Sequence, residues 1–196
     1  MAGRCRPSGH VGYGRDLRPG PGEAAVTRAR PGALVTGASS GIGYELAKIL
    51  AREGHDVALV ARSADQLEKI ASDLEEDFGV RALAVAADLS DPQAPDRIFE
   101  GLRGAELRAD VLINNAGFGT IGRFARSDTS AQVDMVAVNV AALTHLTRLF
   151  VEPMVARRQG RIMNVASTAA FQPGPFMAVY FATKAYVLSF SEALAE

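Results

Sequence analysis

Three side chains near the end of the sequence have types and spacings suited to proton transfer at an oxygen atom. Tyr180 and Lys184 stand four residues apart, so a helix would place phenol and ammonium on one face, one turn apart. Ser167 lies thirteen residues before Tyr180, at the end of an apolar, strand-like run. A Tyr-x-x-x-Lys pair is common on helix surfaces and is weak evidence alone. The trio predicts a site only if the rest of the chain brings it together.

A glycine-rich turn predicts where a phosphate-bearing ligand would bind. It follows the apolar run at residues 32–37 and precedes a helical pattern at residues 42–54. Glycines allow tight bending and close approach of the backbone to a pyrophosphate, which the first amides of the helix can bind. A tight turn without a ligand is the alternative, because short motifs are weak on their own. The candidate cofactor-binding residues here are Gly37, Ser39, Ser40, Gly41, Ile42 and Gly43.

Short apolar runs alternate with helical patterns from Gly32 onwards. The runs are nearly continuous in Val, Ala, Leu and Ile, as in parallel strands covered on both faces. Right-handed crossovers then give a doubly wound parallel α/β sheet, so we predict a Rossmann-like, three-layer α/β/α fold. The predicted strands are residues 32–37, 56–62, 81–90, 109–117 and 161–167; the predicted helices are 42–54, 63–79 with Ser63 as N-cap, 92–103, 129–158 and 178–195.

The first 31 residues differ in composition from the rest. They are rich in Arg, Gly and Pro without apolar periodicity, and they predict a disordered leader. A transit peptide or a nucleic-acid arm are weaker alternatives. Residues 32–196 predict a single dinucleotide-binding and catalytic domain.

Composition argues against several classes of function. The net charge of −1 argues against nucleic acid as the main partner. The longest apolar runs fall short of the roughly eighteen residues of a spanning helix, so we predict no membrane span. Cys5 is the single cysteine, which favours a reducing, cytoplasmic location. Three scattered histidines predict no metal site.

The motifs, taken in order, resemble the short-chain dehydrogenase/reductase family from about Gly32 to Glu196. The turn reads Gly-x-x-x-Gly-x-Gly, unlike the Gly-x-Gly-x-x-Gly of long-chain dehydrogenases. Residues 114–117 read Asn-Asn-Ala-Gly, which matches the family motif after the fourth strand. The resemblance implies the catalytic residues Asn139, Ser167, Tyr180 and Lys184, and adds Asp88, Asn115, Ala116, Gly117, Tyr180 and Lys184 to the cofactor-binding residues.

Asn139 would, by the same resemblance, hold a water molecule that links Lys184 to solvent. A structural hydrogen bond or a helix kink is a serious alternative, because buried polar groups often serve structure alone.

Arg62 indicates which dinucleotide would bind. It ends the second predicted strand, where an acidic residue would bind the ribose 2′-hydroxyl of NAD and a basic one the 2′-phosphate of NADP. Arginine can pair with phosphate through two hydrogen bonds. Asp65 lies too far along the following helix to serve NAD. We therefore predict NADP (NADPH) rather than NAD, with an ordinary exposed arginine as the alternative.

The predicted chemistry is hydride transfer between a nicotinamide and a carbonyl or alcohol, which needs a proton donor or acceptor at the oxygen. Tyr180 would be this general acid and base. Opposite charges about 4 Å apart interact by roughly 4 kcal/mol at an effective dielectric of about 20, so the Lys184 ammonium would stabilise the phenolate. Ser167 would donate a hydrogen bond to the substrate oxygen.

The substrate and the assembly are less well defined by sequence. The apolar loop at residues 169–177 and Phe118 predict the wall of a site for an apolar ketone, aldehyde or acyl group, although the loop could also belong to the core. In the resembled family, the helices matching residues 129–158 and 178–195 pair subunits, which implies a homodimer or homotetramer.

Complete family members continue past the last predicted helix, so the resemblance implies that C-terminal strands are missing. Two alternatives to an NADP-dependent oxidoreductase stay open. One is a nucleotide-binding or interaction module without turnover, because of that incompleteness. The other is a sugar-nucleotide epimerase or dehydratase, which usually has a Gly-x-x-Gly-x-x-Gly turn that this sequence lacks.

Overall fold

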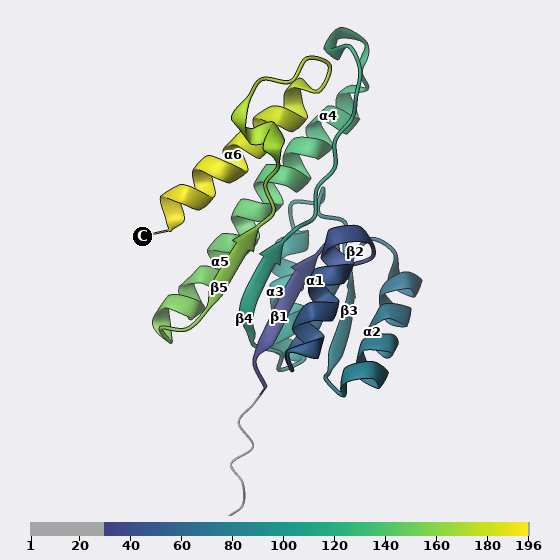
Figure 1. Ribbon diagram of the computed structural model, residues 1–196, viewed down its shortest axis with the longest axis vertical. Helices are drawn as coiled ribbons and strands as arrows, with labels where there is room; N and C mark the ends of the chain where they lie inside the picture. The colour runs from purple at the N-terminus through teal and green to yellow at the C-terminus, as the bar shows by residue number, and fades with distance from the viewer. Residues whose placement is uncertain (1–29, 196) are drawn as a thin grey trace, which may run out of the picture.

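The computed structural model describes residues 30–195, and Figure 1 shows their arrangement. Residues 1–29 and 196 lie outside the described residues. The predicted leader and the boundary at residues 31/32 therefore stay predictions.

Five parallel strands form one sheet in the order β3-β2-β1-β4-β5. β1 pairs with both β2 and β4, so the chain winds outward from the middle in one direction and then in the other. This reversal confirms the predicted doubly wound fold. The strands are β1 (Gly32–Thr36), β2 (Asp56–Ala61), β3 (Ala82–Ala86), β4 (Ala109–Asn114) and β5 (Arg161–Asn164).

Helices cover both faces of this sheet (Figure 1). Successive side chains of a strand point to opposite faces. Val35 of β1 accordingly packs with α1 and α2, whereas its neighbour Leu34 packs with α3 and α5. Two apolar cores result, one on each side, which confirms the three-layer arrangement. The helices are α1 (Gly41–Arg52), α2 (Ala64–Phe78), α3 (Ala94–Gly104) and α5 (Leu143–Ala156).

The predicted helix over residues 129–158 has three parts. It begins as α4 (Thr129–Val136), continues as the π-helical segment η2 (Ala137–Ala142) and ends as α5. The Asp128 carboxylate caps its start by accepting hydrogen bonds from the N–H groups of Ser130 and Ala131. The π-helical segment was not predicted; such segments frequently occur at functional sites.

The last helix, α6 (Ala178–Leu194), packs against α4 and η2. It follows the short 3₁₀ turn η3 (Thr168–Phe171), which also packs against it. In Figure 1, α6 and α4 run beside each other at the end of the molecule that lies beyond β5.

The observed strands β3, β4 and β5 end earlier than predicted, at residues 86, 114 and 164. At these points the chain leaves the sheet, and the following residues form loops with side-chain hydrogen bonds. Ser63 occupies the N-cap position of α2 as predicted, but its hydroxyl makes no capping bond with the described residues.

One stretch among the described residues, Thr129–Ala156, is long and apolar enough to cross a membrane by length and composition alone. Core helices of soluble proteins can pass the same criteria, and its α5 part contributes Leu146 and Phe150 to the core beneath the sheet. Our prediction that no apolar run approaches the length of a spanning helix is therefore not supported for this stretch. The absence of a membrane span stays a prediction.

Candidate active site

The glycine-rich turn after β1 is shaped by three glycines. Gly37 and Gly41 have φ angles of 66° and 55°, in the left-handed region that favours glycine. A Cβ at Gly43 would lie 2.2 Å from the Gly37 carbonyl oxygen, so a larger residue does not fit. A Cβ at Gly41 would meet no described atom within 4 Å. The turn is therefore tight on its inner side and open on its outer side.

Thr36 and Asn115 tie this turn to the loop after β4. Thr36 Oγ1 accepts hydrogen bonds from the N–H groups of Asn115 and Ala116, both at 3.0 Å. The Asn115 amide donates to the Thr36 carbonyl at 2.9 Å. We predicted Asn115 as a cofactor contact, and the structure shows its side chain joining the two loops. Thr36 was missed, although it directly precedes the first glycine of the motif.

The start of α1 suits an anion. Ser40 is its exposed N-cap, and the Ser40 hydroxyl makes no capping bond with the described residues. Within α1, all of which is described, the first turn carries no acidic side chain. The first amides and the positive end of the helix dipole are thus available to a phosphate group. The Gln66 side chain of α2 donates a hydrogen bond to the Ser39 carbonyl at 2.7 Å, which links the glycine-rich turn to α2.

Arg62 and Asp88 follow neighbouring strands, β2 and β3, and both are exposed. Asp88 accepts hydrogen bonds from the Ser90 N–H at 2.9 Å and the Ser90 hydroxyl at 2.8 Å. These two bonds, with a smaller contribution from the Arg62 charge, hold the pKa of Asp88 below its ordinary value. Arg62 and Asp88 follow the carboxyl ends of parallel strands and therefore lie on the same edge of the sheet as the glycine-rich turn.

Lys184 and Tyr180 share one face of α6, as their spacing predicted. Lys184 Nζ lies 5.9 Å from the centroid of the Tyr180 ring and donates a hydrogen bond to the Val165 carbonyl at 2.7 Å. Lys184 is only 6% exposed. This burial lowers the pKa of the ammonium from its ordinary 10.5, because a low-dielectric environment disfavours charge.

The loop after β4 lies against Tyr180 and Lys184. A Cβ at Gly119 would lie 2.8 Å from Cδ2 of the Tyr180 ring, and one at Gly117 would lie 3.6 Å from Lys184 Nζ. The absence of side chains at these two glycines therefore allows the loop to approach the candidate catalytic residues. Gly119 was not singled out from the sequence.

Asn139 is 1% exposed and lies in the π-helical segment η2. Its amide donates to the Phe118 carbonyl at 2.9 Å and to Thr183 Oγ1 at 3.1 Å, and it accepts from the Phe118 N–H at 3.1 Å. Both of its donors are thus used inside the protein, which favours the structural alternative. Its predicted role in holding a water stays untested. Thr183, which lies between Tyr180 and Lys184 in sequence, was missed.

Ser167 is half-buried at the start of η3. Its Oγ accepts a hydrogen bond from the Ala169 N–H at 3.1 Å, and this contact leaves the hydroxyl proton for another acceptor. Because η3 packs against α6, Ser167 stands at the start of the segment that meets the helix carrying Tyr180 and Lys184.

Apolar side chains surround this region. Phe171 and Phe176 are 76% and 59% exposed, so these residues of the predicted wall do not belong to the core. The Gly122 N–H donates to the Phe176 carbonyl at 2.9 Å and joins the loops after β4 and β5. A cavity of about 550 Å³ lies between α4 and Val179, the residue before Tyr180.

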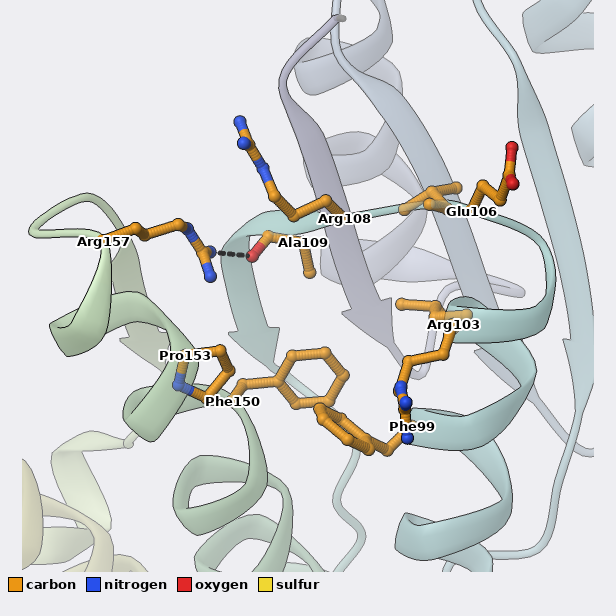
Figure 2. A pocket seen from close by; sticks show the side chains of 10 residues that line it. Phe99, Arg103, Glu106, Arg108, Ala109, Phe150, Pro153 and Arg157 are labelled. Carbon is orange, nitrogen blue, oxygen red and sulfur yellow. Dashed lines mark hydrogen bonds between the residues drawn. The ribbon is translucent and has the colours of Figure 1, made fainter.

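A second cavity, of about 330 Å³, lies at the opposite edge of the sheet. Figure 2 shows it between α3 and α5, with Phe99 and Phe150 in edge-to-face contact and the Arg157 guanidinium bonded to the Ala109 carbonyl. Ala109 is the first residue of β4, so this cavity is remote from the candidate catalytic residues. Across residues 30–195, no group of His, Cys, Asp and Glu side chains could hold a metal ion.

Known proteins resemble this chain over most of its length. The sequence model of the short chain dehydrogenase family matches residues 32–196. Very-long-chain 3-oxoacyl-CoA reductase of Anas platyrhynchos is 36% identical over 190 residues, a match covering 94% of this chain and 58% of the relative. The Homo sapiens enzyme of the same name is 33% identical over 190 residues, covering 95% and 58%.

Solved structures agree with the fold. A short-chain dehydrogenase from Sphingobium yanoikuyae in complex with NADPH has a TM-score of 0.79 and 38% identity, covering 84% of this chain and 64% of that one. L-sorbose reductase from Gluconobacter frateurii, complexed with NADPH and L-sorbose, has a TM-score of 0.78 and 39% identity, covering 85% and 64%.

The chain belongs to the short-chain dehydrogenase/reductase family, as its motifs predicted. It spans 58% of the length of the reductases named above.

Proposed function

We propose that this protein is an NADP-dependent oxidoreductase that transfers hydride between the nicotinamide and a carbonyl or secondary alcohol. The observation that carries the proposal is the buried Lys184 amine beside the Tyr180 ring, on the helix that follows Ser167. These residues lie beyond the carboxyl ends of parallel strands, where α/β sheets bind their ligands. The glycine-rich turn occupies the same edge.

Each candidate residue has one task in this proposal. The bound dinucleotide supplies or accepts the hydride. Tyr180 gives its phenolic proton to the carbonyl oxygen during reduction and takes it back during oxidation. Lys184 stabilises the phenolate by its charge, while the Val165 carbonyl holds its amine in place. Ser167 directs its hydroxyl proton at the same substrate oxygen.

The glycine-rich turn and the first amides of α1 would hold the pyrophosphate, and Arg62 the 2′-phosphate. The uncapped start of α1 and the exposed position of Arg62 support this assignment. The two solved relatives described above were both complexed with NADPH.

The substrate we propose is an apolar ketone or acyl group. The exposed Phe171 and Phe176 near α6 support this class. So do the names of relatives, which include very-long-chain 3-oxoacyl-CoA reductases and a Mus musculus 17-beta-hydroxysteroid dehydrogenase type 3 that is 34% identical over 164 residues.

Replacing Tyr180 by Phe tests the chemistry. Turnover of NADPH with a panel of aliphatic ketones, aryl ketones and a 3-oxoacyl thioester should fall by about 10²–10⁴-fold, because the general acid is lost. NADPH affinity, measured by fluorescence titration, should stay the same. Tyr186→Phe, which also removes one hydroxyl from α6, is the control. Retained turnover in Tyr180→Phe contradicts the proposal, and NADPH binding without turnover in the unaltered chain favours the nucleotide-binding module.

Replacing Arg62 by Ala tests the cofactor. Loss of charge-assisted hydrogen bonds worth roughly 1.5–3 kcal/mol should weaken NADPH binding by about 10–100-fold. NADH binding should be unchanged, because it has no 2′-phosphate. Calorimetric titration with both nucleotides distinguishes these results, and equal affinities for the two in the unaltered chain would argue against NADP preference.

We also propose a homodimer or homotetramer and a cytoplasmic location. Val133 and Val136 expose apolar surface on α4, at 61% and 44%, and this surface could pair with another subunit. Light scattering on the purified chain measures the assembly, and a monomer at all concentrations contradicts it.

A further inference from the structure

The helix that carries Tyr180 and Lys184 is held by little apolar packing. Among the described residues of α6, those buried are Thr183, Lys184 and Val187, and two of these are polar. β5, which precedes it, is also thinly covered: Arg161 and Met163 are exposed, and the other two residues are only half-buried. Burial of apolar surface therefore contributes less to the placement of this helix than it does for α2 or α5, each of which buries four apolar residues.

A chain of side-chain hydrogen bonds crosses this region instead. Asn114 at the end of β4 is 3% exposed, and its amide donates to Thr147 Oγ1 at 3.0 Å and to Asn164 Oδ1 at 2.9 Å. The Asn164 amide donates to Ser191 Oγ at 2.9 Å. Ser191 in turn donates to the Val187 carbonyl at 2.6 Å, one helical turn earlier. The polar relay Thr147–Asn114–Asn164–Ser191 thus links α5, β4, β5 and α6.

The relay ends close to the groups that would perform the chemistry. Asn164 is the last residue of β5, and Val165 follows it. The Val165 N–H donates to the Asn114 carbonyl at 2.9 Å, while the Val165 carbonyl accepts from Lys184 Nζ at 2.7 Å. The same short segment is therefore fixed to β4 on one side and to α6 on the other. A shift of α6 relative to Asn164 would move Lys184 away from Val165 and change its position relative to Ser167.

We propose that Asn164 and Ser191 are positioning residues for the catalytic trio. Through Asn114 they hold α6 at the ends of β4 and β5, and so set where Tyr180 and Lys184 stand relative to Ser167. This role rests on the proposed function, in which the trio acts on one substrate oxygen. Neither residue belongs to the motifs from which the site was predicted.

A matched pair of variants isolates the hydroxyl of Ser191. Thr and Val have nearly the same shape, but only Thr keeps a hydroxyl that can bond the carbonyl one turn back. Ser191→Val should therefore cut the relay, and Ser191→Thr should preserve it. Asn164→Leu cuts the relay at Asn164 and keeps the number of side-chain heavy atoms the same. Tyr186→Phe is the control, because it removes a different α5–α6 hydrogen bond, the 2.8 Å contact with Thr144.

The first readout is turnover of the full chain with NADPH and the ketone it reduces best. Misplacement of catalytic groups by about 1 Å can cost roughly 10²-fold in rate, so we expect kcat to fall by at least about tenfold in Ser191→Val and Asn164→Leu. NADPH affinity should stay within about threefold, since the glycine-rich turn lies on other strands. Ser191→Thr and Tyr186→Phe should match the unaltered chain.

The second readout needs no turnover. Acetylation of Lys184, followed by mass spectrometry across a pH series, reports how its amine titrates. When the relay is cut, Lys184 should become less buried, and the midpoint should rise towards that of an ordinary lysine in Ser191→Val but not in Ser191→Thr. Equal midpoints in Ser191→Val, Asn164→Leu and the unaltered chain would overturn the proposal, as would an equal shift in Ser191→Thr. If no ketone is reduced, the proposed function fails, while the labelling result still decides whether the relay positions Lys184.

Discussion

Two regions of the molecule are held in place by different interactions: residues 32–86, here called the nucleotide half, and residues 161–194, here called the catalytic half. β1 in the nucleotide half is buried along its whole length, and β2 is buried at its four central residues. β5 in the catalytic half alternates between exposed and half-buried residues. The helices differ likewise: α2 buries four apolar residues, whereas two of the three buried residues of α6 are polar.

The two halves therefore keep their geometry through different kinds of contact. Apolar packing and glycine backbone contacts shape the nucleotide half, where the proposed dinucleotide would meet mainly backbone groups. The side chains of Asn139, Asn164 and Lys184 donate hydrogen bonds that join α6 of the catalytic half to η2, to β5 and to the residue after β5. Hydrogen bonds are directional, so they can fix the orientation of reacting groups where apolar contact is sparse. Three sets of variants test this contrast.

Gly43→Ala should have the largest combined effect on stability and NADPH binding, because it disrupts the backbone packing of the nucleotide half. The added Cβ would lie 2.2 Å from the Gly37 carbonyl oxygen, an atom that cannot move without opening the turn. We expect the free energy of unfolding to fall by about 4 kcal/mol and NADPH binding to be lost. Gly101→Ala in α3 is the control, because its Cβ would meet no described atom within 4 Å; it should stabilise the helix by roughly 0.5–1 kcal/mol. Urea denaturation measures both, and similar effects at the two glycines would contradict this account.

Leu59→Ala and Met163→Ala compare the two halves directly. Leu59 in β2 is fully buried, whereas Met163 in β5 is 46% exposed. Truncating the buried leucine should cost about 2–5 kcal/mol, and truncating the exposed methionine should cost about 0.5 kcal/mol or less. Equal losses in denaturant midpoints would show that the catalytic half depends on apolar packing as much as the nucleotide half.

Lys184→Met should have the smallest effect on stability, visible as a change in how the free energy of unfolding depends on pH. Burial lowers the pKa of Lys184 below 10.5. Between the pKa in the folded protein and the ordinary value of 10.5, the unfolded chain therefore binds more protons than the folded chain. Stability contributed by this group therefore rises with pH across that window, since burying the charged amine is unfavourable below it. Lys184→Met should lose this rise. Denaturation at a series of pH values measures the slope, and an unchanged slope would mean that Lys184 is charged and well solvated in the folded protein.

Local features of the fold were accessible from the sequence. The alternation of apolar runs and helical patterns located all five strands, although β3, β4 and β5 end three to four residues before the predicted limits. Apart from Asp88 and Asn115, those excess residues are apolar or small like the strands, so composition does not mark sharply where the chain leaves the sheet. The π-helical segment around Asn139 was likewise missed, because its residues have the same apolar spacing as the flanking α-helices.

Which side chains hydrogen-bond to one another was much harder to predict from the sequence. Thr36 and Thr183 have few distinguishing features in sequence. Yet Thr36 joins the loops after β1 and β4, and the Thr183 hydroxyl accepts a hydrogen bond from the buried amide of Asn139. Asn114 was noted only as part of a motif, whereas its side chain is the centre of the relay.

The sequence by itself determined the alternation of strands and helices, the glycine-rich turn and the one-turn spacing of Tyr180 and Lys184, since these depend on periodicity and backbone conformation within short windows. Only the tertiary structure decided that Lys184 meets Val165, that Asn139 is bonded inside the protein and that Asn164 meets Ser191. Those contacts join residues 19 to 27 positions apart, so they depend on how the strands and helices close on one another, and not on any local pattern.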